Sequence, residues 1–114
     1  MKNKAEIGKN GEILAKEFLL GKNYIILHTN WRHKRSEIDI IAQDKKIIVF
    51  VEVKARNNNL FGNPEEFVNA NKIKKMREAA DAYIEQFDWK GELRFDIISI
   101  EKDNKLTHFE DAFY

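Results

Sequence analysis

The stretch Ser36–Arg56, which reads SEIDIIAQDKKIIVFVEVKAR, sets acidic and basic side chains into two apolar runs. The first run is Glu37–Ala42, and the second is Ile47–Lys54, after the short polar segment Gln43–Lys46. β-Branched and aromatic residues on both sides of a short polar turn are typical of two antiparallel strands. The stretch therefore predicts a β-hairpin that carries charges within its strands.

The length of the turn decides where the charged side chains of this hairpin lie. Side chains alternate between the two faces of a strand, so Glu52 and Lys54 share one face of the second strand. A turn with an even number of residues places Asp39 on that same face, opposite either Phe50 or Glu52. An odd-length turn would scatter these charges. We expect the even-length turn, with two carboxylates and an ammonium group brought together.

Two carboxylates at this spacing favour a divalent cation. They repel each other by about 4 kcal/mol at 4 Å and an effective dielectric constant near 20, and Lys54 offsets only part of this. Mg²⁺ usually needs one or two protein carboxylates and keeps waters that can attack a phosphodiester. Asp39 and Glu52 fit as ligands, with the Val53 carbonyl as a further ligand, and Lys54 fits a role in holding the attacking water or stabilising the phosphorane charge. The alternative is a set of exposed charges on an edge hairpin, with Asp39 paired to Lys54.

Helical periodicity predicts a first helix over about residues 4–20. Its buried stripe is expected to contain Ile7, Leu14 and Phe18. Glu12 lies off this stripe, on a row with small residues that would let another element come close. As a surface residue, Glu12 would instead pair with a neighbouring lysine, Lys9 or Lys16.

A second helix is predicted after the hairpin. Asn63 is the expected N-cap, with Pro64 at the first helical position and Glu66 completing a capping box, and the helix runs to about Gln86. The positions expected to face the core are Ile73, Met76, Ala80, Tyr83, Ile84 and Phe87.

The remaining segments complete an αβββαββ order. Strands are predicted at Tyr24–His28, Arg94–Ile100 and Leu106–Phe109, and a basic loop is predicted at residues 30–35. The strand-helix-strand connection from Val53 to Phe95 requires two parallel strands. The sequence therefore predicts an α/β fold with a mixed central sheet flanked by helices.

Composition predicts one domain of 114 residues, of which 43% are apolar and 34% charged. The absence of cysteine excludes disulfides and thiolate metal sites, and the three histidines have no zinc-ligand spacing. The longest apolar run, Ile47–Val51, is too short to cross a bilayer, so no membrane partner is expected and a cytoplasmic location is predicted. The sequence does not decide between a monomer and a homodimer.

Asp39, followed after twelve residues by Glu52-Val53-Lys54, resembles the Asp…Glu-x-Lys signature of restriction-endonuclease-like nucleases. Motifs along nearly the whole chain are similar to those of the YraN family of bacterial proteins, whose fold is similar to that of archaeal Holliday junction resolvases. One departure is Ser36, where the family usually has Gly. The motifs are Gly8, Gly11-Glu12, Asn30-Trp31-Arg32, Glu37–Ala42, Val49–Arg56, Arg94-Phe95-Asp96 and Asp111-Ala112-Phe113.

The resemblance implies a restriction-endonuclease-like core and a metal-dependent endonuclease that hydrolyses phosphodiester bonds in structured or branched DNA with Mg²⁺ or Mn²⁺. Junction resolvases place a helix Glu beside their metal carboxylates, which implies that Glu12 joins Asp39, Glu52 and Lys54 as the catalytic set. Glu37 is expected on the face of Asp39 as an accessory acid. The alternative function is a non-catalytic nucleic-acid-binding or partner-docking module of the same fold.

Nucleic-acid binding must come from local basic patches. The formal net charge is only +1, from 20 basic and 19 acidic residues, so the whole molecule has no strong field to attract a polyanion. Trp31 is expected in the core rather than stacked on a base. The residues predicted to contact nucleic acid are Arg32, Lys34, Arg35, Arg56 and Lys72.

Overall fold

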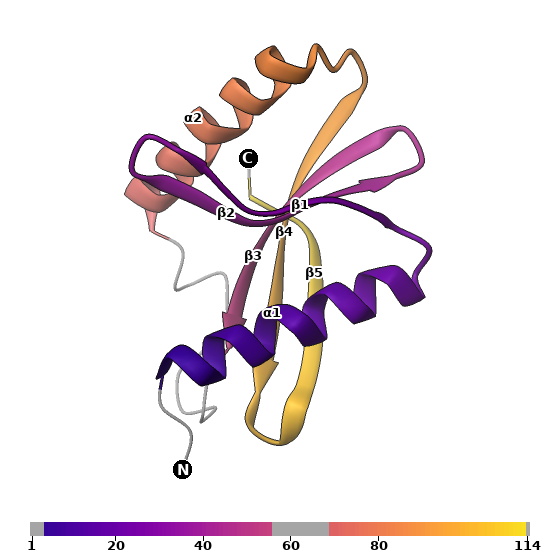
Figure 1. Cartoon of the computed structure of the whole chain (residues 1–114), viewed down its shortest axis with the longest axis vertical. Helices are drawn as coiled ribbons and strands as arrows, with labels where there is room; N and C mark the ends of the chain where they lie inside the picture. Colours follow the sequence, from indigo (N-terminus) through magenta and orange to yellow (C-terminus); the bar gives the residue numbers. More distant parts are fainter. Residues whose placement is uncertain (1–3, 56–68, 114) are drawn as a thin grey trace.

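A five-stranded mixed sheet forms the centre of the computed structural model, which describes residues 4–55 and 69–113 (Figure 1). Side chains are described from residue 9 onward, except that of Lys102. The elements are α1 (Lys4–Gly21), β1 (Ile25–His33), β2 (Ser36–Asp44), β3 (Ile47–Ala55), α2 (Ala70–Phe87), β4 (Glu92–Glu101), the short 3₁₀ turn η2 (Lys102–Asn104) and β5 (Lys105–Phe113).

The strands follow the order β1-β2-β3-β4-β5 across the sheet. All neighbours are antiparallel except β3 and β4, which are parallel and are joined through α2. The predicted α/β class, the αβββαββ order and the mixed sheet are confirmed. Neither helix in the described part of the chain is long and apolar enough to cross a membrane.

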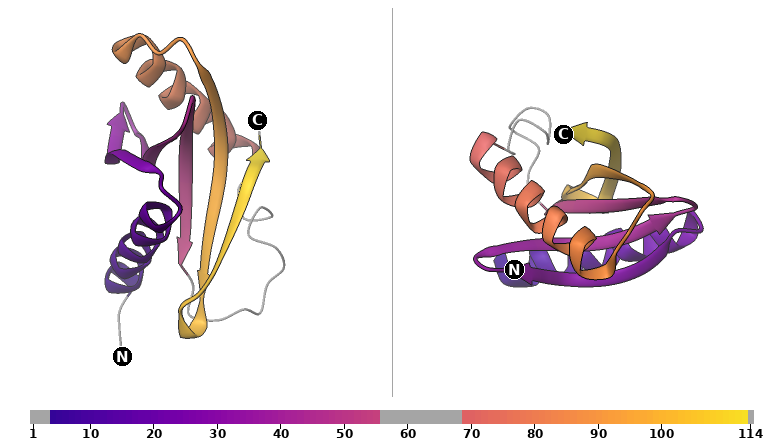
Figure 2. Two further views of the ribbon diagram at one scale, coloured as in Figure 1. Left: turned by 90° about the vertical axis from the view of Figure 1, so that its right-hand side faces the viewer. Right: turned by 90° about the horizontal axis from the view of Figure 1, so that it is seen from above.

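The two helices cover opposite faces of the sheet (Figure 2). Ile48 and Phe50 of β3 pack with α2, whereas Val49 and Val51 pack with α1. This alternation follows from the pleat of a strand that is buried on both faces, which is why Ile47–Val51 is continuously apolar.

The face of α1 that meets the sheet differs from the predicted stripe. Ala15 and Leu19 are fully buried, whereas Phe18 is 36% exposed. The reason lies at Gly11, where an added Cβ would come within 2.6 Å of the Ala55 Cβ. Because Gly11 lets α1 approach β3 this closely, the row of small residues faces the sheet and Phe18 is turned toward its margin.

The predicted basic loop at residues 30–35 is wrong, because β1 continues through it as far as His33. Trp31 pairs with Ile38 and Arg32 pairs with Glu37 in the β1–β2 ladder, so only Lys34 and Arg35 form the turn. The polar composition of residues 30–33 led to the prediction of a loop, although these residues form a strand with one exposed face. Trp31 packs against the α2-side core, as predicted, with its ring 5.3 Å from that of Tyr83.

The helix α2 begins later than predicted. Asn69 is extended (φ −78°, ψ 171°), and its side chain accepts a hydrogen bond from the Lys72 amide, so the described helix starts at Ala70. The predicted cap at Asn63, Pro64 and Glu66 lies outside the described residues.

Of the predicted core positions in α2, Met76, Ala80 and Tyr83 are buried, and Ile73 and Ile84 are partly buried against the core. Phe87 is 46% exposed, because the helix ends there and its ring lies at the margin of the core, against the rings of Tyr83 and His28.

A buried carboxylate holds β4 and β5 together where their pairing is irregular. Asp96 is fully buried and accepts two hydrogen bonds of 2.8 Å from Arg94. It also contacts His108 Nε2 at 2.7 Å and accepts from the Asp111 amide. Burial by itself would raise the pKa of Asp96, but the hydrogen bonds from His108, Arg94 and the Asp111 amide lower this pKa below its ordinary value.

We expect Asp96→Asn to lower the free energy of unfolding by about 3 to 5 kcal/mol, because it leaves the Arg94 guanidinium without its buried counter-charge. Urea unfolding at pH 7 measures the change. Asp81→Asn, an isosteric change at an exposed position of α2, is the matched control and should stay within about 0.5 kcal/mol of the unmodified protein. Equal unfolding midpoints for the two variants would contradict the role given to Asp96.

Candidate metal centre

The hairpin of β2 and β3 has a two-residue turn, Lys45-Lys46, because Asp44 pairs with Ile47. The even-length turn is therefore confirmed, although it is shorter than the polar segment of the sequence suggests. The ladder runs from this turn as far as the pair Ile40–Val51. The same register, continued by one residue, brings Asp39 opposite Glu52.

The strand β2 leaves β3 at Asp39. In Figure 1, the half of β2 next to the β1–β2 turn runs toward α2, while β3 runs toward the opposite end of the molecule. Side-chain alternation also breaks there, since Ile38 packs on the α2 side and Ile40 on the α1 side. The Val53 amide donates a 2.8 Å hydrogen bond to Asp39 Oδ2. The carboxylate thus provides a hydrogen-bond acceptor for a backbone amide of β3 just beyond the last ladder pair.

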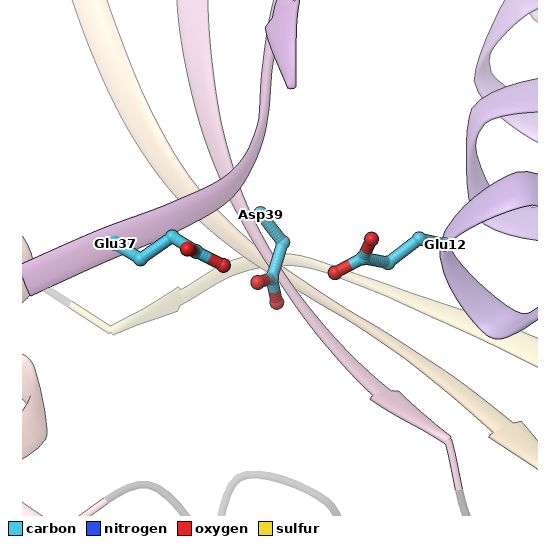
Figure 3. A group of neighbouring side chains, drawn as sticks. All are labelled: Glu12, Glu37 and Asp39. Carbon is cyan, nitrogen blue, oxygen red and sulfur yellow. The ribbon is translucent and has the colours of Figure 1, made fainter. Parts of the chain in front are cut away.

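Three carboxylates from two elements gather at this break. Oxygens of Glu12, Glu37 and Asp39 lie within 4.8 Å of one another, with Glu12 reaching in from α1 (Figure 3). Asn30 of β1 donates its amide hydrogens to Glu12 at 3.2 and 3.3 Å and to Glu37 at 3.3 Å. Sequence reasoning missed this role for Asn30. The available signal was an Asn inside a strand, where its positive φ of 51° suits Asn better than most residues.

Glu52 lies beside this cluster but has different partners. It is only 4% exposed, and its two oxygens lie 3.5 Å from Lys54 Nζ and 3.5 Å from Lys72 Nζ. It does not belong to the group of acidic oxygens within 4.8 Å of one another in the described part of the chain. The alternative of exposed charges with Asp39 paired to Lys54 is wrong, because Glu52 is buried and is itself the partner of Lys54.

The carboxyl group of Asp39 has too few positively charged neighbours to stabilise its ionised form. Burial, followed by the charge of Glu52, raises its pKa from 3.8 to about 7; Glu12 adds to the rise, and the Val53 amide and Lys72 oppose it. A cluster of hard oxygen donors with uncompensated negative charge fits a divalent cation such as Mg²⁺ or Mn²⁺.

The predicted nucleic-acid contacts lie in different settings. Lys34 and Arg35 are exposed at the β1–β2 turn, whereas the 78%-exposed Arg32 pairs with Glu37 at 3.0 Å. Lys72 faces Glu52 rather than lying free, and Arg56 is outside the described residues.

Two hollows open on either side of the acidic cluster. One of about 200 Å³ is lined by Glu12 and Asp39 together with Lys9 and Lys16 of α1, whose position sequence reasoning did not relate to the site. The other, of about 210 Å³, lies between the β1–β2 turn and α2. Its lining is Arg35, Ser36, Glu37, Lys72, Lys75 and Met76.

The five-stranded mixed sheet and its two helices define an α/β protein whose architecture is compatible with a nuclease-like core. The chain belongs to UPF0102, the YraN family, described as an uncharacterised protein family, whose profile matches residues 11–100. This confirms the family identified from the motifs.

Curated relatives of the same family align with this chain over nearly their whole length. The chain is similar to a UPF0102 protein of Flavobacterium psychrophilum, at 48% identity over 96% of this chain and 94% of the relative. It is also similar to UPF0102 proteins of Thermodesulfovibrio yellowstonii, at 46% identity over 96% of both chains, and of Bacteroides thetaiotaomicron, at 44% over 96% and 93%. These names state family membership and no activity.

We expect Asp39→Asn to stabilise the metal-free protein, and more so at pH 8 than at pH 5. The raised pKa means that the folded protein keeps a proton that the unfolded chain releases between pH 4 and 7, so stability falls as the pH rises through this window. Asn removes this penalty and still offers an oxygen to the Val53 amide. The gain at pH 8 should be roughly 1 to 4 kcal/mol, because a pKa moved from 3.8 to about 7 corresponds to at most about 4 kcal/mol.

Urea unfolding in the presence of EDTA measures this effect, with the exposed substitution Asp103→Asn as the control. If Asp39→Asn does not raise the free energy of unfolding, or raises it more at pH 5 than at pH 8, then the carboxylate of Asp39 is not destabilised by its surroundings. Adding Mn²⁺ at pH 8 should stabilise the unmodified protein more than Asp39→Asn, because a ligand that binds only the folded state adds to its stability.

Proposed function

We propose that the protein is a metal-dependent endonuclease, similar to Holliday junction resolvases, that hydrolyses phosphodiester bonds in structured or branched DNA. The observation that carries this proposal is the convergence of three carboxylates, Glu12, Glu37 and Asp39, where β2 leaves β3, with Glu52 beside them and the pKa of Asp39 raised to about 7. A purely structural cluster would be expected to neutralise its own charge. Here burial and the charges of Glu52 and Glu12 destabilise the ionised form of Asp39, and a bound cation would offset this.

The residues that would hold Mg²⁺ or Mn²⁺ are Asp39 and Glu52, with the Val53 carbonyl. When bound, such a cation supplies Lewis-acid polarisation of the phosphoryl group and a water of lowered pKa. Glu12 and Glu37 border Asp39 and would hold the waters around it through their free oxygen lone pairs. Asn30 keeps these two carboxylates in place by donating to both.

Lys54 would act on the phosphoryl group as charge develops on it. Its ammonium group lies 3.5 Å from Glu52, and its side chain is 30% exposed, so it is held at the site and can still reach a substrate. A donor fixed beside the reacting group stabilises the phosphorane without the cost of reorganising water.

The DNA would approach across the β1–β2 turn. Lys34 and Arg35 are exposed there, and the hollow beside them leads past Glu37 to the acidic cluster. Arg32, and Arg56 after β3, would add phosphate contacts. A substrate of this kind agrees with the predicted cytoplasmic location.

We expect Lys54→Ala to lower the single-turnover rate of cleavage of a branched DNA by about 10² to 10³ while leaving its affinity nearly unchanged, because Lys54 acts mainly on the transition state. Glu52→Gln should in addition remove the metal dependence. Gel-shift affinity and single-turnover cleavage, measured on the same junction with Mg²⁺ or Mn²⁺, check both expectations. A non-catalytic binding module would show no metal-dependent cleavage even when unmodified, and Lys54→Ala would then weaken binding only.

Replacing Arg32 and Arg35 by Ala and Lys34 by Asn, which suits the φ of 56° at residue 34, should flatten the dependence of log K on log salt by about 2 to 3, since each phosphate contact contributes about 0.9 to the slope. Fluorescence anisotropy with labelled junction DNA at several salt concentrations measures it. The matched control removes three lysines from other turns, through Lys45→Asn, Lys46→Ala and Lys90→Ala, with Asn chosen because φ at residue 45 is 57°. Equal slopes for the two triple variants would show that the patch is assigned to the wrong surface.

A further inference from the structure

Lys72 is a second lysine of the site that the Asp…Glu-x-Lys pattern does not include. It lies in the first turn of α2, where its amide donates to the capping side chain of Asn69 at 2.9 Å. Its ammonium group lies 3.5 Å from Glu52 Oε2, and Lys54 lies 3.5 Å from Oε1. Each oxygen of one buried carboxylate therefore faces a different ammonium group, one from the sheet and one from the helix.

The contact between Lys72 and Glu52 is loose. A charge-assisted hydrogen bond is about 2.7 to 2.9 Å long, whereas this contact is 3.5 Å, and Oε2 accepts no hydrogen bond from the described residues. The Glu52 side chain is only 6% exposed, but that of Lys72 is 37% exposed. The ammonium group can thus move into solvent, while the carboxylate stays in the site.

We propose that Lys72 is an exchangeable counter-ion of Glu52: it neutralises this carboxylate in the metal-free protein, gives it up when a divalent cation binds, and is then free to contact a substrate phosphate. The inference rests on the proposed metal site. Without Lys72, buried Glu52 would lose the only charge that faces its second oxygen among the described residues. With Lys72 fixed there, the ammonium group and the cation would compete for the same oxygen.

Lys75 provides a matched control for this competition. It lies one turn further along α2 and lines the same hollow as Lys72. No ion pair between Lys75 and Glu52 occurs in the described part of the chain. Removing either lysine lowers the net charge by one, so a difference between the two variants reports the local interactions of Lys72 with Glu52 and Asp39 rather than the general field.

Isothermal titration with Mn²⁺ at pH 7.5 tests the exchange without any measurement of activity. We expect Lys72→Met to bind Mn²⁺ at least about tenfold more tightly than the unmodified protein, because the competing charge is gone. Lys75→Met should stay within about twofold, and Lys72→Arg, which keeps the charge, should stay near the unmodified protein. In the Glu52→Gln background, the gain in affinity from Lys72→Met should be clearly smaller, because the shared carboxylate is absent and only the charge of Lys72 near Asp39 remains.

The unmodified protein gives a second test, which does not depend on whether Lys72→Met folds. Acetylation of lysine amines, followed by mass spectrometry, should show Lys72 reacting several-fold faster after Mn²⁺ is added, with the rate at Lys75 unchanged. Tight Mn²⁺ binding with equal affinities for Lys72→Met and Lys75→Met, or with no change in Lys72 reactivity, would overturn the exchange and leave the metal site standing. Failure of the unmodified protein and all variants to bind Mn²⁺ would overturn the proposed function together with this inference.

Discussion

The hydrogen bond from the Val53 amide to Asp39 is the contact on which the candidate site depends. Two strands of a hairpin normally continue to pair until one of them ends, because every unpaired buried amide costs free energy. Here β2 and β3 separate after Ile40–Val51, although both strands continue. Because a carboxylate supplies the acceptor for Val53, the strands can diverge without leaving this amide unsatisfied. The divergence, in turn, makes room for side chains from α1 and α2.

The close approach of α1 is the second requirement. An α-helix with an ordinary side chain at residue 11 would be held away from Ala55, and Glu12 would lie further from Asp39. The helix α2 meets the opposite face of the sheet, and Lys72 in its first turn reaches Glu52. The site is therefore assembled from both faces of the sheet at the one place where the sheet opens. A regular, fully paired sheet would separate Glu12 from Lys72 by its own thickness.

The buried carboxylates at this site lower the stability of the folded protein, and interactions elsewhere in the structure offset this loss. The raised pKa of Asp39 records a cost of burying like charges together, in contrast to Asp96 of β4, whose pKa is lowered by its hydrogen bonds. Both carboxylates are buried in the same sheet. Asp96 has a complete set of partners and fastens β5 to β4, whereas Asp39 has one backbone donor and three acidic neighbours, Glu12, Glu37 and Glu52. Local conflict of this kind marks a functional site more often than a structural one.

Local sequence patterns were sufficient to predict the hairpin, the parallel crossover and the placement of Asp39 near Glu52, because strand alternation and turn parity depend only on neighbouring residues. They failed for β1 between Asn30 and His33, where pairing with β2 outweighed the polar composition, and for the exposed face of α1, where one close contact at Gly11 set the rotation of the helix.

Only the tertiary structure decided which groups surround the charged strands. The sequence alone determined that Asp39, Glu52 and Lys54 share one region of a hairpin, since their spacing along two short strands leaves few alternatives. It could not determine that Asn30 joins Glu12 to Glu37, or that Lys72 faces Glu52. Those contacts join residues from separate elements, and they depend on where β2 leaves β3 and on how closely each helix packs, which is set by the core as a whole and not by any local pattern.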